Sequence, residues 1–126
     1  MSFSKQQLQE MLEQGFEFNK IHAVDGVFTI TTTNKLHIQY LLDEDNNFLE
    51  ILASGDPIND SKMVDAYVFC NEYISPLLQP YFLTEDKSVW TKFCIMTKDC
   101  SLLYIYNQIH LAHMAINDFF DKAKQL

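Results

Sequence analysis

The sequence predicts an α+β fold in which an antiparallel sheet is covered by helices, with the element order α-β-β-β-α-β-β-α. Three observations predict it. A helical pattern comes first, a run of strand-like segments follows, and the second half holds a helix, a strand pair and a long final helix. The strands are grouped and do not alternate with helices, which argues against a parallel sheet. With 126 residues, the chain is expected to form one domain, residues 1–126.

The first helix is predicted to begin after Ser4, which is a suitable N-cap residue. Its apolar residues recur at helical spacing: Leu8, Met11 and Leu12. Gly15 is expected to end it in the left-handed conformation, at positive φ. The alternation of apolar and polar residues over 16–19 then predicts a short extended segment.

A three-stranded meander is predicted next. Asp25-Gly26 lies between short apolar pairs and predicts a tight hairpin turn, because both central residues of that turn need positive φ. The apolar residues then alternate, which places one set on one face of the sheet: Phe28, Ile30, Leu36, Ile38, Tyr40 and Leu42. The third strand follows the polar turn 43–47. Gly55-Asp56-Pro57 ends the meander.

The second half begins with a helix that Asp60 or Ser61 is expected to cap. Its predicted apolar residues are Met63, Val64, Tyr67, Cys70, Ile74 and Leu77. A strand pair follows around Asp86-Lys87, and Asp99 is the expected N-cap of a final helix that runs to about residue 124.

The charge pattern excludes several classes of partner. The formal net charge is −8, and all nine basic residues are lysines. Without arginine the chain has no bidentate guanidinium to clamp a phosphate, and an acidic chain repels nucleic acid and anionic membranes. Neither nucleic acid nor a membrane is therefore expected as a partner.

The cysteine pattern indicates the compartment. Cys70, Cys94 and Cys100 are odd in number and show no metal-ligand spacing, which indicates reduced thiols in a cytoplasmic protein. No signal-peptide pattern and no apolar run of about 20 residues is present.

The sequence contains three weak chemical signals. His110 and His113 share a predicted helix face, but no acidic residue accompanies them as it does in a zinc-binding helix. Asp43, Asp45 and Asn47 resemble the start of a calcium loop, but that loop needs Gly and Glu where Phe48 and Ser54 stand. Cys100 begins a helix, yet no protease signature surrounds it. No catalytic residue, metal or cofactor is therefore predicted.

The last strand and last helix offer more apolar residues than one buried face needs. On the helix, one stripe is expected to face the sheet: Leu102, Tyr106, Ile109, His113, Ile116 and Phe120. The residues that lie off this stripe, together with the outward side of the last strand, predict a homodimer or partner interface: Trp90, Cys94, Met96, Leu103, Leu111 and Met114. A deeply buried helix and a strand buried on both faces are the alternatives.

The chain resembles the YbjN-type domain, a family described as bacterial sensory transduction regulators, which shares its fold with the type III secretion chaperones. The resemblance covers nearly the whole chain. It rests on the helix end Leu12-Glu13-Gln14-Gly15-Phe16, the Asp25-Gly26 hairpin, the second helix with Asn71 and Tyr73, and the closing strand pair and helix. The family's second helix typically carries an asparagine pair, of which only Asn71 is clear here. The resemblance implies a cytosolic, dimeric, non-enzymatic protein that binds other proteins.

The functional hypothesis is therefore a small dimeric interaction module that is chaperone-like or regulatory and binds an unidentified protein. The alternative is a small-ligand-binding protein or an enzyme with a pocket between sheet and helices, to which His37, Tyr40 and Asp65 would contribute polar groups.

Overall fold

The computed structural model describes residues 2–16 and 20–126. The predicted extended segment at 16–19 falls mostly outside the described residues. The helices and strands follow in this order: α1 (Lys5–Glu10), a π-helical turn η1 (Met11–Gly15), β1 (His22–Val24), β2 (Val27–Thr31), β3 (His37–Asp43), β4 (Phe48–Ser54), a 3-10 turn η2 (Asp60–Lys62), α2 (Met63–Glu72), β5 (Gln79–Leu83), β6 (Ser88–Met96) and α3 (Leu102–Ala123).

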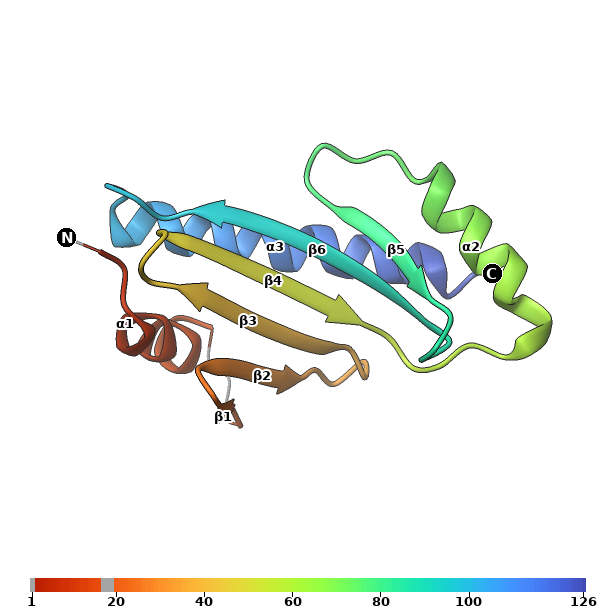
Figure 1. The fold of residues 1–126 in the computed structure, drawn as a ribbon, viewed down its shortest axis with the longest axis horizontal. Helices are drawn as coiled ribbons and strands as arrows, with labels where there is room; N and C mark the ends of the chain where they lie inside the picture. Colours follow the sequence, from red (N-terminus) through yellow and green to blue (C-terminus); the bar gives the residue numbers. More distant parts are fainter. Residues whose placement is uncertain (1, 17–19) are drawn as a thin grey trace.

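The strands form one antiparallel six-stranded sheet in the order β1-β2-β3-β4-β6-β5, and α3 runs along one face of it (Figure 1). The α+β class is therefore confirmed. The sheet has one strand more than the predicted order, because the three residues before the first hairpin turn pair with β2. β6 lies between β4 and β5, because the chain leaves the sheet through α2 and returns at its edge.

The tight turns follow the sequence. Asp25 and Gly26 have φ values of 51° and 80°, which confirms the predicted hairpin turn. Lys35, Asn47 and Lys87 also take positive φ where the chain reverses between strands. Local turn chemistry therefore sets the register of these hairpins.

The core lies between the sheet and its helices, on the face that we call the inner face. Alternate residues of β2, β3, β4 and β6 are buried there, as predicted for β2 and β3: Phe28, Ile30, Ile38, Tyr40, Leu42, Leu49, Ile51, Ala53, Val89, Thr91, Phe93 and Ile95. Leu8 and Leu12 from the first helical segment are fully buried in the same cluster.

The stripe predicted for the last helix is partly wrong. The buried residues of α3 are Ile105, Ile109, Ala112, Ile116, Phe119 and Phe120. Leu102, predicted in the stripe, is exposed, and Phe119, which is not among the residues of the predicted stripe, is fully buried. Phe119 is covered by α2, because its ring lies 5.2 Å from that of Phe69 and 4.7 Å from that of Tyr73.

The helix starts agree with the sequence only at α1. Ser4 accepts a hydrogen bond from the Gln7 N–H and its own N–H donates to the Gln7 side chain, which makes a capping box. The predicted caps Asp60 and Ser61 are wrong, because both residues lie in the 3-10 turn that precedes α2. The N-cap positions are Asn59 for this turn and Lys62 for α2, and neither of them makes a side-chain cap hydrogen bond. Ser101, and not Asp99, caps α3 by accepting from the Tyr104 N–H at 3.1 Å.

Gly15 does not take the predicted positive φ, since among the glycines only Gly26 does so. The helix instead continues through Gly15 as a π-helical turn. A Cβ atom on Gly15 would lie 2.8 Å from Cε2 of Tyr106, and the Tyr106 hydroxyl donates to the Gly15 carbonyl at 3.2 Å. Close approach to α3 therefore explains the glycine better than backbone conformation does.

Candidate protein-binding surfaces

The second face of the sheet, which we call the outer face, is not buried by the described helices. Its residues alternate with the core residues along each strand, and most of them are half-buried or exposed. The register brings apolar outer-face residues together in neighbouring strands: Phe48 pairs with Met96, and Trp90 lies beside Tyr81. Half-buried Leu41 and Leu52 extend this surface across β3 and β4.

Trp90 lies within this surface, on β6. Its ring stacks on Tyr81 with centroids 6.3 Å apart and planes 10° from parallel. Its Nε1 donor is buried and has no hydrogen-bond partner among the described residues. An unpaired indole N–H costs free energy, so a partner that offers an acceptor after a small side-chain shift would gain from it.

The outer face carries few charges, and two of them form an ion pair. Lys92 and Glu50 form an ion pair at 3.6 Å between β6 and β4, and both side chains are about one-third exposed. The pair leaves the surrounding surface mostly apolar, which is the composition expected at the centre of a protein interface.

Burial disfavours the thiolate form of two of the three cysteines. Partial burial raises the pKa of Cys94, and burial raises the pKa of Cys70 to about 11, so both thiols stay protonated at neutral pH. Cys100 donates to the carbonyls of Met96 at 3.5 Å and Lys98 at 3.4 Å.

The six residues predicted as an interface belong to two surfaces. Trp90, Cys94 and Met96 point to the outer face, as predicted from the alternation in β6. Leu103, Leu111 and Met114 lie on α3, which packs on the inner face. Met96, Leu103 and Met114 are 61%, 69% and 57% exposed, whereas Leu111 is half-buried. One flat contact does not cover both groups, because the sheet lies between them.

A third apolar surface lies on α2. Val64, Tyr67 and Val68 are all exposed and follow helical spacing, with Val64 at 74%. The sequence analysis named Val64, Tyr67 and Cys70 among the apolar residues of this helix without saying which of them are buried. In the structure Cys70 is buried together with Ala66. The sequence did contain a signal for this exposed surface, because the helix carries more apolar residues than one buried stripe requires.

The pocket predicted from His37, Tyr40 and Asp65 is not formed. His37 is exposed on the outer side of β3, whereas Tyr40, three residues later, is fully buried on the inner face. Asp65 lies on α2, near Val68 and Glu72. The three polar groups therefore do not converge.

Tyr40 instead pairs with His113 of α3. The Tyr40 hydroxyl and Nε2 of His113 are 2.6 Å apart, and the Phe16 ring meets the His113 ring edge-on at 4.8 Å. Burial, with a smaller contribution from the charge of nearby His110, lowers the pKa of His113 to about 4. Neutral His113 therefore serves the core as a hydrogen-bonding residue, and this use of Nε2 competes with metal binding.

No group of three or more potential metal-ligating side chains occurs in residues 2–16 and 20–126. Residues 43–47, which resemble the start of a calcium loop, form a turn that is held by hydrogen bonds within the segment. Both carboxylate oxygens of Asp43 accept hydrogen bonds from Asn46, one from its backbone N–H and one from its side chain. These bonds lower the pKa of Asp43.

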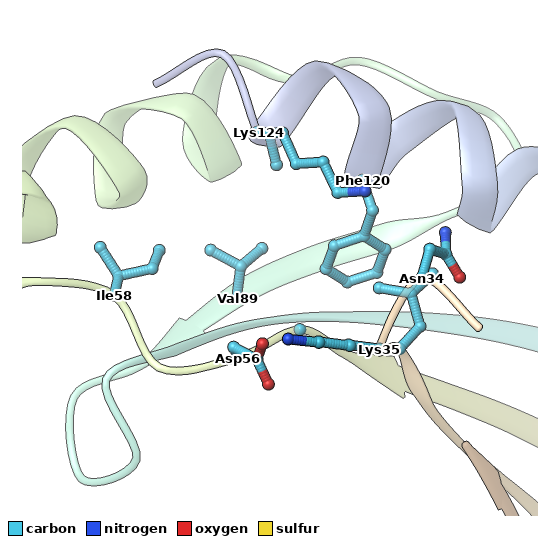
Figure 2. A pocket seen from close by; sticks show the side chains of 10 residues that line it. Asn34, Lys35, Asp56, Ile58, Val89, Phe120 and Lys124 are labelled. Atoms are coloured by element: carbon cyan, nitrogen blue, oxygen red, sulfur yellow. The ribbon is translucent and has the colours of Figure 1, made fainter. Parts of the chain in front are cut away.

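A separate cavity of about 220 Å³ opens at the other end of α3, between that helix and the sheet (Figure 2). Val89 and Phe120 line its floor, and Lys35, Asp56 and Lys124 stand at its rim. The sequence prediction placed a pocket between sheet and helices but named none of these residues.

No helix in the described part of the chain is both long and apolar enough to cross a membrane.

Neither a protein-family model nor a curated protein matches the chain. The resemblance to YbjN-type domains therefore stays a prediction.

Three solved structures are similar. A chain of the ExsC-ExsE complex aligns with a TM-score of 0.59 and 13% identity, over 86% of each chain. A chain of the HopA1-SchA chaperone-effector complex gives 0.53 and 11%, over 87% of this chain and 90% of that one. A chain from the complex of the Yersinia pestis type III secretion chaperone SycH with a fragment of YscM2 gives 0.56 and 13%, over 90% and 98%. At these identities the likeness shows the fold, which is that of type III secretion chaperones.

Proposed function

We propose that this protein is a non-enzymatic, chaperone-like or regulatory module that binds a segment of another protein in the cytoplasm. The uncovered outer face of the sheet, with Trp90 and Met96 among its apolar residues, is the observation that carries the proposal. The fold supports it, since two of the similar structures are described as complexes of chaperones, one with an effector and one with a fragment of YscM2.

The outer face has the properties of a recognition surface. Its apolar side chains lie on neighbouring strands and are held in place by the buried residues that alternate with them. A preordered surface loses little conformational entropy on binding. An extended partner segment with apolar side chains would bury Trp90, Met96 and Phe48 together.

The side-chain chemistry supports a binding role over a catalytic one. Two of the thiols have raised pKa values, and the His113 ring is hydrogen-bonded to Tyr40 in the core. Binding through apolar contacts needs neither a nucleophile nor a cofactor.

The proposal is tested by photo-crosslinking in the native host. A photoreactive amino acid replaces Met96 on the outer face in one strain and exposed Asn107 on α3 in a control strain. We expect one dominant protein to be crosslinked at position 96 and not at 107. Equal labelling at both positions, or crosslinks at neither, would contradict the proposed surface.

We also propose that the protein is a homodimer whose contact uses one of the two predicted groups, either the β6 residues on the outer face or the α3 residues. Exposed apolar surface on both elements supports this, but the α2 stripe formed by Val64, Tyr67 and Val68 is a competing contact. Either stripe would bury apolar area in a symmetric dimer, where the same patch meets itself.

Light scattering at micromolar concentration tests the dimer. The unaltered protein is expected at twice the chain mass, and Met96→Glu or Leu103→Glu is expected to reduce it to a monomer. If Tyr67→Glu is a monomer while Met96→Glu and Leu103→Glu remain dimers, the dimer contact lies on α2 and not on β6 or α3. A monomeric unaltered protein would rule the dimer out.

A further inference from the structure

The cavity at the C-terminal end of α3 has an apolar interior and a polar rim. Its buried wall consists of Leu36, Val89 and Phe120, with half-buried Ile58 and Ala123 beside them. Figure 2 shows the Phe120 ring pointing from α3 toward the strand that carries Val89. Lys35 and Asp56 lie on the sheet side of this ring, and Lys124 lies on the helix side.

The volume of this cavity limits the ligand. About 220 Å³ exceeds the roughly 150 Å³ that hold a benzene molecule in an engineered cavity, and is below the roughly 300 Å³ at which drug-sized pockets begin. The space therefore suits an apolar group of about six carbons.

The walls are held by backbone hydrogen bonds, so the cavity is preorganised. In the turn before β3, the Thr32 backbone N–H donates to the Leu36 carbonyl at 2.9 Å, and the Leu36 N–H donates to the Thr32 hydroxyl at 3.0 Å. After β4, the Ile58 N–H donates to the Lys87 carbonyl at 2.7 Å. Ligand binding then requires little ordering of the chain.

Gly55 keeps part of the cavity open. It lacks a positive φ, so its backbone does not demand glycine. A Cβ atom there would lie 3.5 Å from the Phe120 ring, an ordinary contact distance. Neither strain nor a clash explains the missing side chain, whereas a side chain at this position would occupy the cavity.

The rim is electropositive although the whole chain is acidic. It carries two ammonium groups, on Lys35 and Lys124, and one carboxylate, on Asp56. Within the described residues neither lysine forms an ion pair, while other lysines do so with Asp60, Glu50 and Asp118. An anion at the rim would therefore meet two unpaired cations.

We propose that this cavity binds a carboxylate with an apolar body of about six carbons, the body contacting Val89 and Phe120 and the carboxylate lying between Lys35 and Lys124. This goes beyond the proposed partner binding, which uses the outer face of the sheet. Two sources share this chemistry: a free short-chain carboxylic acid, and the C-terminal apolar residue of a peptide.

The test uses three probes that each contain six carbons and differ in charge: hexanoate, hexanamide and hexylamine. Each is titrated into the ¹⁵N-labelled full chain and followed by NMR. Hexanoate is expected to bind saturably with a Kd of about 1 mM, shifting the amides of Leu36, Gly55, Val89 and Ala123. Hexanamide is expected to bind more weakly, and hexylamine most weakly.

Variants separate charge from space. The double change Lys35→Gln and Lys124→Gln is expected to weaken hexanoate binding about tenfold and leave hexanamide unchanged. Asp56→Asn removes the opposing charge and is expected to strengthen hexanoate binding. Ala123→Leu fills the cavity and is expected to abolish binding of all three probes. Gly55→Ala is the milder filling variant, should Ala123→Leu fail to fold.

A hexapeptide ending in leucine, with a free or an amidated C-terminus, distinguishes the two sources. Tighter binding of the free-carboxylate peptide than of hexanoate identifies a chain end, and the reverse order identifies a free acid. Equal affinities for hexanoate and hexanamide, or unchanged hexanoate binding in the filling variants, would overturn the proposal. Crosslinking at Met96 is unaffected by either result, so failure here is distinguishable from failure of the proposed function.

Discussion

At the level of single residues, contacts between distant segments decide the roles of Gly15 and His113. Gly15 and Tyr106 are 91 residues apart in sequence and share a hydrogen bond. His113 and Tyr40 are 73 apart and share another. Both contacts join α3 to earlier parts of the chain, so both depend on the packing of this helix against them.

Gly15→Ala is expected to destabilise the protein by about 1–3 kcal/mol, because the added methyl group overlaps the Tyr106 ring. Gly55→Ala is the matched control and is expected to be neutral or slightly stabilising, since its methyl group meets only ordinary contacts. Urea unfolding measures both. Equal effects of the two changes would contradict the packing argument.

The pH dependence of stability is expected to report His113. Its pKa falls from 6.5 in the unfolded chain to about 4 in the folded one, mainly through burial. Between these pH values the unfolded state binds more protons than the folded state. The contribution of His113 to the free energy of unfolding is therefore fully present above pH 6.5 and decreases as the pH approaches 4. The loss is at most about 3 kcal/mol.

Urea unfolding at a series of pH values measures this loss as a difference between the unaltered chain and His113→Gln. The glutamine does not titrate, so part of the slope between pH 4 and 6.5 should disappear. Parallel pH profiles for the two proteins would show that His113 does not titrate in this way.

At the level of elements, periodicity located the strands and helices better than it located their ends and faces. The alternation along β3 correctly identified Ile38, Tyr40 and Leu42 as one buried face. Strand alternation leaves only two choices, and a turn fixes one of them. A helix surrounded by apolar residues leaves its rotation about its own axis open, which is why the stripe predicted for α3 is partly wrong and no buried side was predicted for α2.

The start of α3 supplies a prediction. Ser101→Ala is expected to cost about 1 kcal/mol, because it removes the acceptor for the Tyr104 N–H. Asp99→Gly is expected to cost nothing, because Asp99 makes no cap and has a φ of 57°, which glycine adopts without strain. Thermal unfolding compares them, and a larger loss for Asp99→Gly would restore Asp99 as the cap.

At the level of the whole molecule, the sheet is covered on one face and open on the other. The inner face supplies the core, while Met96 on the outer face and Tyr67 on the α2 stripe are exposed and Trp90 is half-buried. The single cavity for which we propose a ligand lies on the covered side, at the end of α3. The proposed partner binding and the proposed ligand binding would thus use different sides of the protein.

Amide hydrogen exchange is expected to follow this architecture. β4 pairs with a strand on each side, and every second residue along it is buried, so its amides should exchange slowest. β1 is a three-residue edge strand with every residue exposed, so its amides should exchange fastest among the strands. Equal protection of β1 and β4 in the isolated protein would indicate that a second copy covers the β1 edge.

The sequence by itself determined the α+β class, the order of most elements, the Asp25-Gly26 turn and the outward side of β6. These features depend on neighbours within a few residues, through turn geometry and the two-residue period of strands. Only the tertiary structure decided the role of Gly15, the rotation of α2 and α3, the Tyr40–His113 pair and the cavity beside Phe120. Each of these depends on contacts between residues far apart in the chain, and no local pattern specifies such contacts.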